Sequence, residues 1–261
     1  MPQLPFNNTL GLPFVELQSV DSTNNYAFTQ LHAGLAQHGM AFFAHEQVAG
    51  KGQRGKSWTA PRGSSLIVSL VISPHPLDIS RQFWLNACIA LSAREFFAKY
   101  AGEETKIKWP NDIYWHDRKA GGVLIESIIR GEDPGWQWAV AGIGLNINQA
   151  SFPPELHNPV SLRQITGREF DTVALAKDLC GTIDRNFQTL TREGFEAIYD
   201  SYLDILYKKN EKVRFRNGTR IFEAEVRSVS RSGSLVIRHG IEEEVKHGQI
   251  EWLVPAFRNE G

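Results

Sequence analysis

The sequence predicts an α+β fold, with a sheet and separate helices in a larger part and strands alone in a small C-terminal part. Three strand-like runs follow one another at 106–115, 121–130 and 136–147, with a polar turn at 116–119 between the first two. The helical patterns lie outside this block. Consecutive strands with helices set apart favour a mixed or antiparallel sheet.

The N-terminal elements are predicted to be short and to be separated by turn and helix-capping residues. A strand at 14–20 leads through the cap-type residues 21–23 into a helix over 24–36. Further strands are predicted at 40–47 and 65–72. The second of these, "SLIVSLVI", is rich enough in apolar and β-branched residues to predict a buried central strand.

A longer helix is predicted over 79–100. Its residues Trp84, Ala87, Cys88 and Leu91 recur at i, i+3, i+4 and i+7. This spacing predicts an amphipathic helix with one face toward a core.

The C-terminal part changes character. Helical patterns continue from 171 to 207, and alternating strands around the pair Asn217-Gly218 then indicate a hairpin. Short strands continue at regular spacing through 228–253, which predicts a small β-barrel. We therefore expect two domains, 1–209 and 210–261.

Composition restricts the function classes. The 261 residues suffice for one substantial core and a small second domain. Because 28 Lys+Arg balance 29 Asp+Glu, any cationic site must be local, and neither nucleic acid nor membrane is an expected partner. Cys88 and Cys180 are predicted to be reduced, buried thiols, and no apolar run is long enough to span a bilayer. A cytoplasmic protein is expected.

The stretch "VAGKGQRGKSW" (48–58) is a candidate phosphate-binding loop, because glycines expose backbone N–H groups and three cations add charge. Gly50, Gly52 and Gly55 satisfy G-x-G-x-x-G literally, but the loop leads to Trp58 and a strand instead of a helix. That context excludes a dinucleotide fold. A solvated surface loop is the alternative interpretation.

Two further stretches carry candidate site residues. "KWPNDIYWHDRKAGGVLIE" (108–126) places Asn111 and Asp112 after a proline, and Lys119 beside paired glycines where an anion can approach closely. Each is equally explained as a turn residue, and Asp112 as a partner of Lys108 or Arg118. "AGIGLNIN" (141–148) places Asn146 at the end of a buried strand, where its amide can hydrogen-bond a base edge or ribose, or cap a chain reversal.

Together these stretches resemble the biotin protein ligases. The resemblance rests on five ordered pieces: 21–27 ("DSTNNYA"), 46–58, 108–126, 141–148 and the C-terminal strands. It implies a core like that of class II aminoacyl-tRNA synthetases, followed by an SH3-like barrel. It also implies biotin, ATP and Mg²⁺, with biotinyl-AMP as the intermediate and a biotin carboxyl carrier domain of acetyl-CoA or a related carboxylase as the acceptor.

The family pattern also implies site residues. Those for biotin are Ser22, Thr23, Asn24, Gln47, Lys51, Gly52, Gln53, Lys119 and Gly122. Those for ATP and the adenylate are Gly50, Lys51, Arg54, Lys56, Trp58, Asn111, Lys119 and Asn146. Lys119, Asp112 and Arg54 are the expected catalytic residues, with Asp112 as base or guide for the attacking amine. One departure is Gln53, which stands where the family usually has arginine.

Alternatives of other classes stay open. Lipoate and octanoate ligases share the related core, and a non-catalytic biotin- or nucleotide-binding regulator would carry the same loop. Only about 20 residues precede "DSTNN". We therefore expect a monofunctional ligase without a DNA-binding module, in a monomer or a homodimer.

Overall fold

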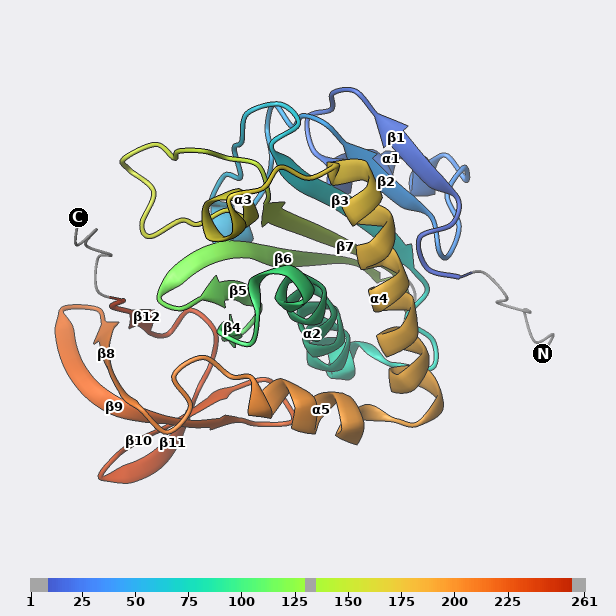
Figure 1. Ribbon diagram of the computed structural model, residues 1–261. Coiled ribbons are helices and arrows are strands. Elements are labelled where there is room, and N and C mark those ends of the chain that lie inside the picture. The colour runs from blue at the N-terminus through green and yellow to red at the C-terminus, as the bar shows by residue number, and fades with distance from the viewer. Residues whose placement is uncertain (1–8, 130–134, 255–261) are drawn as a thin grey trace.

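A computed structural model describes residues 9–129 and 135–254. Its larger part is built on a seven-stranded mixed sheet, which confirms the predicted α+β class (Figure 1). In spatial order the strands are β1 (Phe14–Leu17), β2 (Ala41–Ala44), β3 (Ser65–Ile72), β7 (Trp136–Asn146), β6 (Arg118–Ile129), β5 (Asp112–Trp115) and β4 (Thr105–Lys108). The β1–β2 pair is parallel and the other neighbours are antiparallel.

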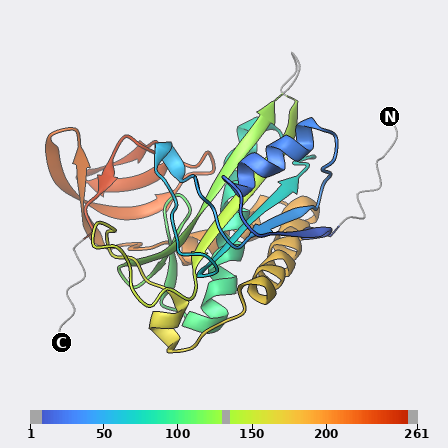
Figure 2. The ribbon, with the colours of Figure 1, turned by 90° about the horizontal axis from the view of Figure 1, so that it is seen from above.

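Helices cover both faces of this sheet. α1 (Thr23–His32) packs on one face against β3 and β7. The other face carries α2 (Gln82–Ala101), α4 (Thr172–Arg192), α5 (Phe195–Asp204) and the short α3 (Leu162–Thr166). Figure 2 shows α1 and the long helices on opposite sides of the strands.

The structure corrects two helix predictions. α2 is not amphipathic, because 11 of its 20 residues are buried between the sheet on one side and α4 and α5 on the other. α1 ends at His32 instead of residue 36, and Gly34 follows with a left-handed φ of 72° that takes the chain out of the helix. None of the helices in the described ranges has the length and apolar character needed to cross a membrane.

The stretch 106–115, predicted as one strand, is two. β4 and β5 form a hairpin in which Lys108 pairs with Asp112, so that 109–111 make the turn. Pro110 has no N–H for a strand ladder, which explains the interruption. The hydroxyl of Tyr202 donates to the Pro110 carbonyl at 2.8 Å and fixes the turn against α5.

The C-terminal part is a five-stranded antiparallel sheet. Its order is β11 (Ile241–Val245), β10 (Leu235–His239), β9 (Arg220–Val229), β8 (Lys212–Asn217) and β12 (Glu251–Trp252). The predicted Asn-Gly hairpin is confirmed, with Asn217 paired to Arg220 and Gly218 at a φ of 58°.

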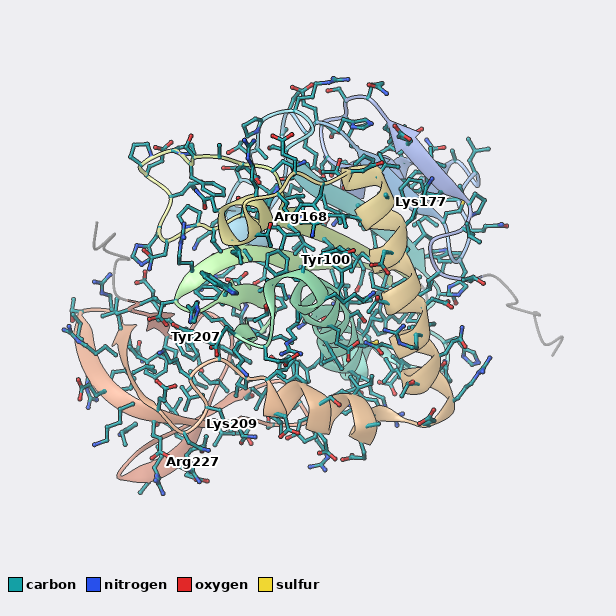
Figure 3. All side chains as sticks on the ribbon, viewed as in Figure 1. Tyr100, Arg168, Lys177, Tyr207, Lys209 and Arg227 are labelled. Atoms are coloured by element: carbon teal, nitrogen blue, oxygen red, sulfur yellow. The ribbon has the colours of Figure 1, made fainter. Side chains whose placement is uncertain are left out.

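This sheet is docked firmly onto the larger part. The indole nitrogen of Trp109 donates to the Gly233 carbonyl at 3.0 Å, and the Phe83 ring packs against Gly233 so closely that a Cβ there would lie 2.7 Å from it. Tyr207, labelled in Figure 3, lies between α5 and β8, and its ring packs near Trp252 of β12 at 6.0 Å between ring centres. The turn 109–111 is therefore held by contacts from both parts of the chain.

Candidate functional site

One face of the central sheet has a floor of glycines. Gly122 pairs with Gly144 across β6 and β7, and Gly142 lies two residues before Gly144 on the same face. A Cβ at Gly142 would lie 2.4 Å from Asn24 Oδ1, and one at Gly144 would lie 2.8 Å from the Trp58 ring. Because these glycines have no side chain, α1 and the glycine-rich loop can pack directly against the backbone of the sheet.

A β-bulge places Lys119 on this face. Tyr114 pairs with Lys119 and Ile113 pairs with Gly121, so Ala120 is the extra residue on β6. Side chains alternate along a strand, and without the extra residue Lys119 would face away from Gly122. With it, Lys119 and Asp112 share the face, and Lys119 Nζ donates to Asp112 Oδ1 at 2.6 Å.

Polar side chains gather at the start of α1. The Thr23 backbone N–H and hydroxyl both donate to Gln47 Oε1, at 2.8 and 3.1 Å. The buried hydroxyl of Ser69 bonds Thr23 Oγ1 and Asn24 Oδ1, and Asn24 Nδ2 donates to Glu126 at 2.7 Å. These contacts leave little freedom for the Thr23 and Asn24 side chains.

Ser22 completes this group. It is 2% exposed, and its hydroxyl has no hydrogen-bond partner within the described part of the chain, although it stands at the N-cap position. The hydroxyl is therefore available to a ligand.

The loop 48–58 folds back over the glycine floor. Lys51 pairs in a bridge with Ser57, and its Nζ donates to Asn25 Oδ1 on α1 at 2.5 Å. Gln53 Nε2 donates to Asn111 Oδ1 at 2.7 Å and to the Val123 carbonyl at 3.2 Å. Gln53, the departure from the family pattern, thus ties the loop to the 109–111 turn.

The same loop reaches the C-terminal sheet. Arg54 has a left-handed backbone (φ 57°), and its guanidinium packs on Gly248, where a Cβ would lie 2.6 Å from it. The loop is therefore held at three points: α1, the 109–111 turn and the C-terminal part.

Asn111 and Asn146 are engaged by the protein itself. Asn111 Nδ2 donates to Asn86 on α2 at 2.6 Å, which extends the chain of amides from Gln53. Asn146 Nδ2 donates to the carbonyls of Lys119 and Val160, at 3.4 and 3.2 Å. These two bonds tie Asn146 to the backbone that carries Lys119, and its contact with adenosine stays a prediction.

Charge at the site is mostly positive. The pKa of Lys108 is lowered to about 8, chiefly by burial; Lys119 and Lys56 also lower it, and Asp112 and Glu251 act in the opposite direction. Burial, together with Arg54, also holds the pKa of His247 below its usual range. Cations from the loop and the sheet therefore lie close to Asp112 and His247.

The structure thus forms two groups of predicted residues beside the glycine floor, one around Thr23 and one around Lys119. Sequence reasoning missed Ser69, Glu126, Asn86 and His247, and treated Lys108 only as a partner for Asp112. A single serine inside an apolar strand, as at Ser69, was the available signal for one of them, because a buried hydroxyl needs a partner.

Residues 16–146, half of the chain, match the biotin/lipoate A/B protein ligase family. The chain belongs to this family. Among biotin/lipoate ligase relatives, the biotin--[acetyl-CoA-carboxylase] ligase of Paracoccus denitrificans is 32% identical over 228 residues, covering 85% of this chain and 92% of that protein.

Longer relatives match as well. The bifunctional ligase/repressor BirA of Bacillus spizizenii is 30% identical over 209 residues, covering 77% of this chain. The match covers 63% of that protein and 57% of the Bacillus subtilis BirA, so this chain spans less than two thirds of either.

The fold also matches a solved ligase structure. The biotin protein ligase of Aquifex aeolicus in complex with biotin and ATP superposes with a TM-score of 0.77 at 23% identity, covering 96% of this chain and 100% of that one. At this identity, the likeness establishes the fold.

Proposed function

We propose that this family member is an ATP-dependent biotin protein ligase. It would activate biotin as biotinyl-5′-AMP and transfer the biotinyl group to a lysine of a biotin carboxyl carrier domain. The observation that carries the proposal is the Lys119–Asp112 pair on a glycine floor, between a buried polar group on α1 and a cationic loop. The names of the relatives support it.

The finer description of the fold belongs to the same proposal. We infer a core of the class II aminoacyl-tRNA synthetase type over 1–209 and an SH3-like barrel over 210–261. The boundary is supported by the last helix, which ends at Asp204, and by the first C-terminal strand, which begins at Lys212.

Ser22, Thr23, Asn24 and Gln47 suit the ureido ring of biotin, which presents two N–H donors and one carbonyl acceptor. Burying the Ser22 hydroxyl, which has no partner within the described part of the chain, against an apolar acyl chain would leave it unpaired, at a cost of about 1–3 kcal/mol. This argument favours biotin over octanoate or lipoate, the related substrates in the family. Lys51, Gly52, Gln53 and Gly122 would border the remainder of the ligand.

The nucleotide would lie under the loop 48–58, along Gly50, Lys51, Arg54, Lys56, Trp58 and Asn111 toward Asn146. In the first step an oxygen of the biotin carboxylate attacks the α-phosphorus, and pyrophosphate leaves. Lys119 would contact both the carboxylate and the phosphate. A preorganised charge of this kind is commonly worth about 10²–10³ in rate.

In the second step an acceptor lysine attacks the acyl carbon. A free lysine amine is almost wholly protonated at neutral pH, so it must be deprotonated or oriented. Asp112 would do this, because its Oδ1 bonds Lys119 and its second oxygen is left for the incoming amine. The closed loop would keep water away from the anhydride.

Mg²⁺ would enter with the nucleotide. No group of three or more His, Cys, Asp or Glu in the described ranges is arranged to hold a metal, and Asp112 is already paired with Lys119. This fits an ion carried by substrate phosphates, as Mg²⁺ commonly is. When bound, it neutralises phosphate charge.

We further propose a cytoplasmic location, consistent with the two buried free thiols Cys88 and Cys180.

The decisive experiment is mass spectrometry of a purified biotin-acceptor domain after incubation with this protein, Mg-ATP and biotin. We expect a gain of one biotinyl group that is lost with Lys119→Ala. Transfer of an octanoyl or lipoyl group to a lipoyl domain instead would assign the other branch of the family. The absence of every transfer would favour a non-catalytic binding protein.

A further inference from the structure

Lys108 is held at the seam between the two parts of the chain. It ends β4 opposite Asp112, and its ammonium lies 5.3 Å from the ring centre of Tyr114 and 5.4 Å from that of Trp252. Trp252 comes from β12 of the C-terminal sheet, so the two walls of this aromatic clamp come from different parts of the chain. Aromatic faces attract and orient a cation without neutralising it.

Other cations surround Lys108. Lys56 and Lys119 lie near enough to act on its charge, and Arg54 and Lys56 act in the same way on His247. We call Arg54, Lys56 and Lys108 the seam cations. His247 sits beside them and packs edge-on against Trp109 at 5.5 Å between ring centres.

The seam cations are not paired at short range, although Asp112 and Glu251 act on the charge of Lys108 from a greater distance. Within residues 9–129 and 135–254, none of the three makes an ion pair within 4.0 Å, whereas the neighbouring Lys119 pairs with Asp112 and Lys51 of the loop pairs with Glu126. Like charges held close together repel, and the repulsion is relieved when an anion enters.

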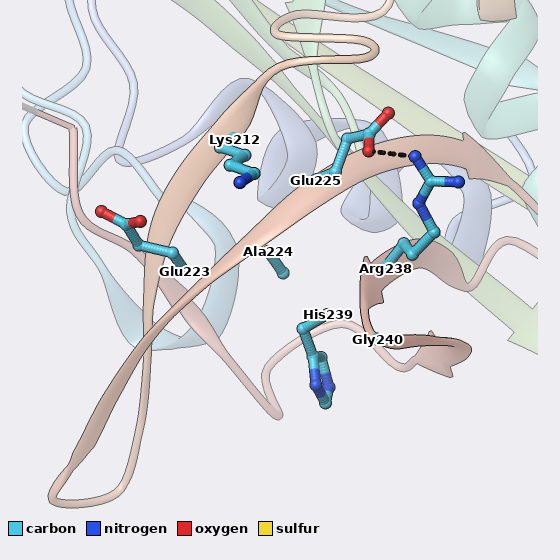
Figure 4. A pocket seen from close by; sticks show the side chains of 7 residues that line it. All are labelled: Lys212, Glu223, Ala224, Glu225, Arg238, His239 and Gly240. Atoms are coloured by element: carbon cyan, nitrogen blue, oxygen red, sulfur yellow. Dashed lines mark hydrogen bonds and ion pairs between the residues drawn. The ribbon is translucent and has the colours of Figure 1, made fainter.

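Recesses elsewhere on the surface are different. On the C-terminal sheet, Arg238 donates to Glu225 at 2.6 Å (Figure 4). Arg227 donates to the same carboxylate at 2.5 Å. In the recess near Tyr207, Lys208 pairs with Asp117 and Glu211, at 3.3 and 3.2 Å. In both recesses these basic side chains are paired with carboxylates. Neither recess is therefore a candidate site for a charged ligand.

We propose that the seam cations, with Lys108 at their centre, form the subsite for the β- and γ-phosphates of ATP and hence for the departing pyrophosphate. This inference rests on the proposed adenylation activity and adds Lys108 as a catalytic residue. Tyr114 and Trp252 are positioning residues, because they act through the Lys108 ammonium. The C-terminal sheet thereby supplies one wall of the nucleotide site.

The chemistry separates the two half-reactions. In adenylation, a carboxylate oxygen of biotin forms a bond to the α-phosphorus while the bond from that phosphorus to the bridging oxygen breaks. The bridging oxygen keeps the electron pair and leaves in pyrophosphate, and no proton is transferred. Lys108 would stabilise the charge that grows on this leaving group. Biotinyl-AMP contains neither of the departing phosphates, so Lys108 has no part in the transfer to lysine.

The test compares the half-reactions in Lys108→Met, which keeps most of the side-chain volume. Biotin-dependent release of pyrophosphate should fall about 10²-fold, and binding of inorganic pyrophosphate, measured by calorimetry, should weaken. Transfer from added biotinyl-AMP to the acceptor domain should be unchanged. Lys106→Met, on the same face of β4 but beside Glu103, should behave as the wild type. Trp252→Leu should lower the same step by a smaller factor.

Equal losses in adenylation and transfer, or wild-type pyrophosphate release in Lys108→Met, would overturn the inference. Failure of the proposed function would look different, because the wild-type protein itself would then release no pyrophosphate with biotin.

Discussion

The ammonium of Lys119 lies 2.6 Å from the carboxylate of Asp112, across two antiparallel strands whose regular pairing would point these side chains to opposite faces. The bulge at Ala120 turns Lys119 onto the face that carries Gly122 and Asp112. The pairing of Lys119 with Asp112 therefore depends on one extra residue in β6.

Lys119→Ala should lower biotin-dependent pyrophosphate release by about 10²–10³-fold. The thermal midpoint should hardly change, because Lys119 is partly exposed and surface ion pairs contribute only about 0–1 kcal/mol. Rapid-quench measurement of pyrophosphate checks the rate, and calorimetry checks the midpoint. Retention of wild-type adenylation would remove Lys119 from the chemistry.

Asp112→Asn should slow transfer from preformed biotinyl-AMP more than it slows adenylation, because the amide cannot accept a proton from the attacking lysine. Single-turnover assays of each half-reaction with an acceptor domain measure the two rates separately. Equal losses in both would assign Asp112 only to holding Lys119.

Gln53→Leu should allow biotinyl-AMP to escape from beneath the loop 48–58. The substitution removes the hydrogen bonds to Asn111 and to the Val123 carbonyl, which hold the loop over the floor. Biotinyl-AMP should then appear in solution at a higher rate relative to transfer, as measured by chromatography. Gln137→Leu, at an exposed position of β7, is the matched control. An unchanged ratio in Gln53→Leu would mean that the loop closes without this contact.

Gly142→Ala should raise the KM for biotin about tenfold and leave the KM for ATP unchanged. The added Cβ would lie 2.4 Å from Asn24 Oδ1, which must move and weaken its bond to Ser69. Loss of a buried hydrogen bond costs about 1–3 kcal/mol, and 1.4 kcal/mol is about tenfold in affinity. Gly181→Ala, with no atom within 4 Å of its Cβ, is the control. Equal changes for both substrates would contradict a biotin-specific role of this end.

The free energy of unfolding should depend on pH through Lys108. Its pKa is lowered, chiefly by burial, from 10.5 to about 8, so between these values the unfolded chain binds more protons than the folded one. Stability linked to Lys108 therefore rises as the pH increases from about 8 to about 10.5. Urea unfolding at several pH values should show a smaller rise in Lys108→Met than in the wild type. Parallel curves for the two proteins would show that Lys108 titrates normally.

Much of the fold is visible in local patterns. The central strand β3 has the predicted bounds, and the hairpin at Asn217-Gly218 forms as its turn residues indicate. Alternation of side chains and turn chemistry are encoded within a few residues, so they can be read without the rest of the chain. The division of 106–115 into β4 and β5 was missed, although Pro110 was a visible signal.

The sequence by itself determined the α+β class, the cationic glycine loop and the candidacy of Lys119 and Asp112, because each depends on residue types at short spacing. Only the tertiary structure decided that a bulge brings these two together, that Ser69 and Glu126 hold Asn24, and that Trp252 clamps Lys108. The physical reason is that strand register sets the face on which every side chain lies. Contacts between residues far apart in the chain form only when the sheet, α1 and the C-terminal strands pack together, and no local pattern records them.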